Sequence, residues 1–200
     1  MTRLNRLAGL ALACALAAPL AAHADERVVF VRHGEKPELG LGQLNCQGLN
    51  RALALPGFIA KTFGRIDAIF AANPSVQKPD RGVPYDYVRP LITIEPTAIT
   101  LGLPVQTRFG FDDPKGLEAA LTDKTYANAT VVVAWEHRVV DVIARDLLAA
   151  HGGDAGQVPT WDDADFDGVY VVTLPADGPA RFQRLVGSGA VFVGLEAEAP

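Results

Sequence analysis

Apolar residues along the chain gather in short runs that are rich in β-branched side chains. Within each run the apolar positions are continuous and do not alternate with polar ones, a pattern typical of strands buried on both faces of a sheet. The runs occupy residues 28–31, 66–72, 130–135, 168–174 and 189–195. We therefore expect a sheet whose strands carry packed layers on both sides.

Segments with apolar residues at helical spacing lie between these runs. We expect helices to start at Asn45, which is a good N-cap, and to cover residues 90–102, 115–121 and 139–150. The alternation of strands and helices predicts the α/β class, as a three-layer α/β/α sandwich with a mostly parallel central sheet. Residues 73–87 are rich in proline, glycine and charge, and we expect a functional loop or small excursion there.

The first 24 residues have a different pattern. Two arginines precede a continuous apolar stretch, and Ala22-His23-Ala24 offers small residues at the offsets of a cleavage site. This pattern predicts a secretory signal peptide over residues 1–24, whose apolar core is short for a bilayer span. Residues 25–200 are then expected to form one domain in the periplasm or outside the cell.

Charge and cysteine content narrow the class of function. Without residues 1–24 the chain keeps 16 basic and 23 acidic side chains, a net charge of −7. This argues against a nucleic-acid or anionic-membrane partner, since both require a basic face. Cys46 would be the only cysteine left, which excludes an intrachain disulfide and a cysteine-based zinc cluster.

Two of the expected strands end in a histidine. His33 follows residues 28–31 directly after Arg32, and His137 follows residues 130–135 directly after Glu136. Open parallel sheets bind ligands at the carboxyl ends of their strands, so both histidines are candidates for a site. A histidine that merely packs in the core is the alternative for either one taken alone.

The residues around these histidines resemble motifs of the histidine phosphatase superfamily, which contains the cofactor-dependent phosphoglycerate mutases and the acid phosphatases. Arg32-His33-Gly34-Glu35-Lys36 resembles the signature of the family, and residues 44–52 are similar to its first helix. Residues 66–74 resemble its second strand, residues 89–93 its second-arginine motif, and residues 131–137 the strand with its second histidine. The likeness runs from about residue 27 to 150 and implies a phosphoglycerate mutase-like fold.

The resemblance also implies a role for each matched residue. His33 would attack phosphorus and form a phosphohistidine that water hydrolyses, with Gly34 leaving room for the phosphate. Arg32 and Arg89 would bind phosphate oxygens through forked hydrogen bonds, and His137 would donate to the developing charge. No metal and no cofactor is then required. For Arg89, a surface salt bridge is the alternative.

The general acid is harder to assign. Acid phosphatases carry an aspartate directly after the second histidine, but Arg138 stands there. Mutases take the acid from a loop before that histidine, which makes Asp112, in the loop 108–114, our first choice; helix capping is the alternative for residues 112–114. Glu136 adjoins His137, but neighbouring strand residues point to opposite faces, which counts against it.

A polar loop follows the expected helix 139–150. Asp163, Asp165, Asp167 and Gly168 resemble the start of a calcium-binding loop, but Leu174 stands where that motif has glutamate. A polar loop that leads into a strand is sufficient to account for these residues.

These observations together predict an exported, metal-independent phosphatase that hydrolyses small phosphorylated substrates through a phosphohistidine on His33. A non-catalytic phosphate-binding module on the same fold and a phosphomutase are the alternatives. The sequence identifies neither the physiological substrate nor the oligomeric state.

Overall fold

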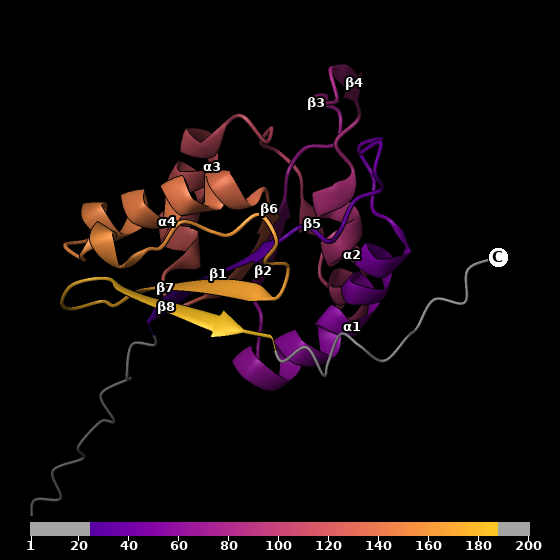
Figure 1. Cartoon of the computed structure of the whole chain (residues 1–200). Helices are drawn as coiled ribbons and strands as arrows, with labels where there is room; N and C mark the ends of the chain where they lie inside the picture. Colours follow the sequence, from indigo (N-terminus) through magenta and orange to yellow (C-terminus); the bar gives the residue numbers. More distant parts are fainter. Residues whose placement is uncertain (1–24, 188–200) are drawn as a thin grey trace, which may run out of the picture.

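The computed structural model of the chain describes residues 25–187 (Figure 1). The predicted signal peptide and the apolar run 189–195 lie outside these residues. No helix within residues 25–187 is long and apolar enough to cross a membrane.

The centre of the molecule is a six-stranded sheet in the order β5-β2-β6-β1-β7-β8. The first four of these strands are parallel: β5 (Val105–Gln106), β2 (Ala68–Ala71), β6 (Thr130–Trp135) and β1 (Glu26–Arg32). Strand β7 (Gly168–Leu174) is antiparallel to β1, and β8 (Arg181–Val186) is antiparallel to β7. The prediction of a mostly parallel sheet is confirmed.

Helices cover both faces of the sheet (Figure 1). On one face, Val29 and Val31 of β1 belong to the core cluster formed with α1 (Cys46–Phe63) and α2 (Arg89–Leu101). On the other face, Val28 and Phe30 belong to the cluster formed with α3 (Pro114–Leu121) and α4 (His137–Ala150). Successive strand residues point to opposite faces of the sheet, and apolar side chains of the helices cover both faces of β1. This explains why the apolar run of β1 does not alternate.

The helix boundaries follow capping chemistry. The side chain of Asn45 accepts a hydrogen bond of 2.8 Å from the amide of Gly48, as expected of an N-cap. Helix α2 ends at Gly102, whose φ of 66° suits glycine in a left-handed C-cap. Asp113 caps α3 by accepting from the amide of Gly116, so the capping alternative for residues 112–114 is filled by Asp113.

The segment 73–87 contains a small hairpin, with β3 (Lys78–Asp80) paired antiparallel to β4 (Val83–Tyr85). It projects from the body of the molecule beside α2 (Figure 1). Two single-turn helices, η1 (Lys124–Tyr126) and η2 (Ala155–Gln157), complete the described elements. The hairpin confirms the predicted excursion and carries side chains to the carboxyl end of the sheet.

Candidate active site

The end of β1 is held by its neighbours on three sides. The amide of His33 donates to the carbonyl of Trp135 at 3.0 Å, which continues the pairing with β6 past Arg32. A side-chain carbon at Gly34 would lie 2.8 Å from the carbonyl oxygen of Gly48, so only glycine lets α1 begin so close to the strand. Gly34 thus gives clearance for α1, and the clearance for a phosphate that we expected of it stays a prediction.

Thr93 links α2 to the same turn. Its hydroxyl accepts from the amide of Gly34 at 2.9 Å and donates to the carbonyl of Arg89 at 2.9 Å. Because this bridge fixes the first turn of α2 against residue 34, it places Arg89 beside the end of β1. The spacing of the Arg89–Thr93 motif thus has a structural cause.

His33 is buried, with 5% of its surface exposed. Its Nδ1 lies 2.8 Å from the carbonyl oxygen of Gly34. A carbonyl only accepts, so Nδ1 carries the proton and Nε2 keeps its lone pair. Burial lowers the pKa of His33 to about 3; the positive charges of Arg89 and Arg32 act in the same direction, and the bond to Gly34 opposes them. At neutral pH the imidazole is uncharged and nucleophilic at Nε2.

Arg32 is anchored by the loop between α4 and β7. Its Nη1 donates to the carbonyls of Asp162, Asp163 and Asp165 at 3.3, 2.8 and 3.0 Å. The guanidinium also lies 3.8 Å from the centre of the Phe166 ring. These neutral partners fix the position of Arg32 and leave its positive charge uncompensated by a direct ion pair within residues 25–187.

Arg89 lies in a buried ion pair with Asp80 of the hairpin. Arg89 Nη1 is 2.6 Å from Asp80 Oδ2, and the two residues are 2% and 4% exposed. Burial tends to raise the pKa of Asp80, but hydrogen bonds from Arg89 and the Gly42 amide outweigh it and hold the pKa at about 2. The salt bridge that is the alternative for Arg89 is present, but it is buried and does not lie at the surface.

His137 begins α4 and is held by Asp163. His137 Nε2 lies 2.6 Å from Asp163 Oδ1, while Arg138 Nη2 lies 2.6 Å from Asp163 Oδ2. Hydrogen bonds from Arg138 and His137 hold the pKa of Asp163 at about 2. The loop 162–166 therefore supplies a carboxylate to His137 and carbonyls to Arg32.

These side chains surround one pocket of about 400 Å³ at the carboxyl end of the sheet. It is lined by Arg32, His33, Lys36, Lys78, Arg89, Glu136, His137, Arg138, Asp163 and Phe166. Within residues 25–187, Arg32 Nε, Arg89 Nε and His137 Nδ1 are buried without a hydrogen-bond partner. The two arginine Nε groups are buried donors without a partner, which is costly, and together with the five cations they make the pocket suited to an anion.

Asp112 and Glu136, the two residues that the sequence offers as the general acid, have different positions in the structure. Asp112 is exposed and does not line the pocket, whereas Glu136 does. The alternation argument against Glu136 fails because β6 ends at Trp135, and Glu136 is the N-cap of α4 with extended backbone. Glu136 and His137 therefore both reach the pocket.

Several lining residues were not predicted as site residues. Lys78 belongs to the excursion 73–87, whose composition suggested function without identifying a side chain. Asp163 and Phe166 belong to the polar loop that resembles a calcium site, and Arg138 was noted only as a departure from the acid phosphatase motif. The cluster of aspartates was the available signal for this loop, but it does not reveal that the loop closes over Arg32.

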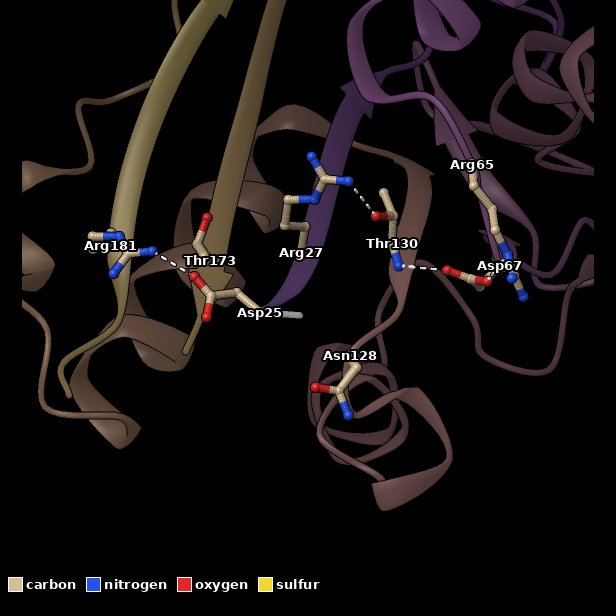
Figure 2. A pocket seen from close by; sticks show the side chains of 8 residues that line it. All are labelled: Asp25, Arg27, Arg65, Asp67, Asn128, Thr130, Thr173 and Arg181. Carbon is tan, nitrogen blue, oxygen red and sulfur yellow. Dashed lines mark hydrogen bonds and ion pairs between the residues drawn. The ribbon is translucent and has the colours of Figure 1, made fainter. Parts of the chain in front are cut away.

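A second pocket, of about 460 Å³, lies at the opposite, amino-terminal end of the strands (Figure 2). In this pocket (Figure 2), Arg181 forms an ion pair with Asp25, Arg65 forms one with Asp67, and Arg27 donates a hydrogen bond to the Thr130 hydroxyl. It contains no histidine.

The sequence has no significant match among family models or curated proteins. Solved structures do match. The protein histidine phosphatase SixA complexed with tungstate shares 17% identity over 82% of this chain and 99% of its own, with a TM-score of 0.58. Phosphoglycerate mutase from Plasmodium falciparum shares 11% identity over 88% and 98%, with a TM-score of 0.56.

A third similar structure is the mycobacterial glucosyl-3-phosphoglycerate phosphatase with inorganic phosphate. It shares 14% identity over 84% of this chain and 100% of its own, with a TM-score of 0.52. The predicted phosphoglycerate mutase-like fold is confirmed by these likenesses and by the sheet order described above.

Proposed function

We propose that this chain is a phosphatase of the histidine phosphatase superfamily, which hydrolyses phosphomonoesters through a phosphohistidine on His33. The observation that carries the proposal is the neutral, buried His33 imidazole with Nε2 free, in a pocket with Arg32, Arg89 and His137. A neutral imidazole beside fixed cations can attack an anionic phosphoryl group, which the cations attract and orient.

The two arginines and His137 have different parts in this reaction. Arg32 and Arg89 neutralise the phosphoryl oxygens, and their positions are set in advance by the 162–166 loop and by Asp80. His137 donates to the charge that develops in the transition state. A bound phosphate would compete with Asp163 for His137, since both are anions with affinity for Nε2.

The substrate class is a small phosphorylated molecule. The similar structures are named for different reactions, on a protein histidine, on glucosyl-3-phosphoglycerate and on phosphoglycerate, so they do not single out one substrate. Location in the periplasm or outside the cell is part of the proposal and rests on the sequence of residues 1–24 alone. Export would separate the protein from cytosolic sugar phosphates, which favours a phosphatase over a phosphomutase.

The test is turnover of an aryl phosphate by the full chain and by His33→Ala. We expect wild-type turnover to persist in a metal chelator and to be lost in His33→Ala, with a phosphorylated wild-type intermediate detectable by rapid acid quench. His151→Ala is the matched control, because His151 is exposed at the end of α4 and does not line the pocket.

Absence of turnover across a wide panel of phosphomonoesters, with phosphate binding intact, would overturn the enzyme and support the non-catalytic binding module. Transfer of the phosphoryl group to another hydroxyl in preference to water would support the phosphomutase instead.

A further inference from the structure

Hydrolysis through a phosphohistidine requires a proton donor in the first step and a proton acceptor in the second. The leaving oxygen of an alkyl or phenyl ester is too basic to depart unprotonated, and water is too weak a nucleophile without a base. One carboxyl group can serve both steps if it lies in the pocket and is not already committed to strong partners. This reasoning rests on the function proposed above.

Among the residues described, two carboxylates line the pocket, those of Glu136 and Asp163. Asp163 accepts from both His137 and Arg138, and these bonds keep its pKa at about 2, so it stays ionised and is a poor proton donor. Its side chain is also 65% exposed. Asp112 lies outside the lining.

Glu136 is placed differently. Its side chain is 12% exposed, and within residues 25–187 its carboxylate makes no hydrogen bond. Glu136 Oε1 lies 3.5 Å from His137 Nδ1, and Oε2 lies 3.8 Å from Lys78 Nζ. Both contacts are longer than an ordinary hydrogen bond, so the Glu136 carboxyl keeps its oxygens available to a bound substrate or water.

Lys78 is positioned by the hairpin to stabilise the carboxylate form of Glu136. Its Nζ lies 4.6 Å from the centre of the Phe111 ring and 5.2 Å from that of Tyr87, so two aromatic faces hold the ammonium opposite Glu136. When Glu136 gives up its proton, this cation compensates the new negative charge. Lys78 is thus a positioning residue that acts through Glu136.

We infer that Glu136 is the general acid and base of the reaction. The His33 Nε2 lone pair forms a bond to phosphorus, the phosphorus–oxygen bond of the ester breaks, and its electron pair takes the Glu136 proton to give the alcohol. A water oxygen then bonds to phosphorus while the Glu136 carboxylate accepts a water proton. The phosphorus–nitrogen bond breaks, its electron pair returns to Nε2, and inorganic phosphate and protonated Glu136 result.

The test uses rapid-quench kinetics to compare how fast esters with different leaving groups phosphorylate the Glu136→Gln variant. p-Nitrophenolate leaves without a proton, so we expect p-nitrophenyl phosphate to give a burst of nitrophenolate equal to the enzyme concentration, followed by slow turnover. Phenyl and simple alkyl phosphates need the proton, and phosphorylation by them should slow by about 10²–10³-fold. Glu95→Gln, an exposed change on α2 away from the pocket, is the matched control.

Equal slowing of Glu136→Gln on all esters, or none, would overturn the inference. So would the selective loss on poor leaving groups appearing in Asp112→Asn instead. A wild type that turns over no ester, or a His33→Ala variant that is fully active, would overturn the proposed function and with it this inference. A Glu136→Gln variant that binds phosphate and melts like the wild type excludes misfolding as the cause.

Discussion

The two ends of the sheet present pockets of similar size, each lined by three arginines, but only one has the properties of a reaction site. The carboxyl-end pocket measures about 400 Å³ and the amino-end pocket about 460 Å³, and both are rich in arginine. At the amino end, Arg65 and Arg181 form ion pairs at the surface and are 87% and 61% exposed, and Arg27 is half-buried. At the carboxyl end, Arg32 and Arg89 are buried around a neutral histidine.

This difference indicates that the burial of the arginines, and not their number, distinguishes a binding site from a charged surface. Exposed pairs are screened by water and contribute little. Buried cations act in a medium of lower dielectric constant, so the same charges attract an anion more strongly. The following predictions test this contrast, in order of decreasing effect.

The largest effect is expected on stability. Arg89→Ala leaves Asp80 buried with only the half-exposed Lys36, at 3.3 Å, as a cationic partner and should lower the free energy of unfolding by about 3 kcal/mol. Arg65→Ala breaks an exposed pair and should cost about 0–1 kcal/mol. Urea denaturation measures both, and the double variant Arg89→Ala/Asp80→Ala should recover part of the loss. Equal losses at the two ends of the sheet would contradict the contrast.

The next effect is expected on catalysis. Arg32→Ala removes a buried cation beside His33 and should lower kcat/KM by about 10²–10³-fold, as loss of a transition-state donor does. Arg181→Ala removes one arginine from the amino-end pocket. It should leave kcat/KM within about twofold of the wild-type value, since no reacting group is near. Steady-state kinetics on one aryl phosphate decide this. A comparable loss in both variants would show that overall charge, and not the buried site, drives the reaction.

A third effect is expected in the pH dependence of stability. The pKa of His33 is about 3 in the folded protein and near the ordinary value of 6.5 in the unfolded chain. Between these values the unfolded chain binds the extra proton, so stability should fall as pH is lowered from about 6.5 towards 3. The slope due to His33 approaches about 1.4 kcal/mol per pH unit.

The variant His33→Asn lacks this titration, and the difference in unfolding free energy between it and the wild type should change over that window. His151→Asn, at an exposed position, should retain the wild-type slope. Parallel curves for wild type and His33→Asn would contradict the buried, neutral histidine.

The smallest effect concerns Asp163. Asp163→Asn removes the carboxylate that competes with phosphate for His137, and inorganic phosphate should bind about two- to fivefold more tightly. Asp146→Asn, on the outer surface of α4, is the control and should leave phosphate affinity unchanged. Titration calorimetry measures both. Weaker binding in Asp163→Asn would mean that Asp163 orients His137 for phosphate and does not compete with it.

Much of the fold could be predicted from the sequence, because the pattern of each element reflects its local environment. The runs that form β1, β6 and β7 are continuous since both faces of these strands are covered. Strand β8 was not predicted because, at the edge of the sheet, it is largely exposed, and its sequence, Arg-Phe-Gln-Arg-Leu-Val, carries polar residues at alternate or adjacent positions. The two-residue strand β5 is too short to leave a pattern.

The candidate site likewise has residues that the sequence predicted and residues that only the tertiary structure revealed. The sequence alone predicted that Arg32, His33 and His137 would meet, because the carboxyl ends of parallel strands converge at one edge of a sheet, and the family resemblance added Arg89. Only the tertiary structure decided which acidic groups join them, since Glu136, Asp163 and the Lys78 hairpin depend on where β6 ends and how two loops pack. The physical reason is that a periodic pattern records local burial, whereas the contacts of a loop depend on distant residues.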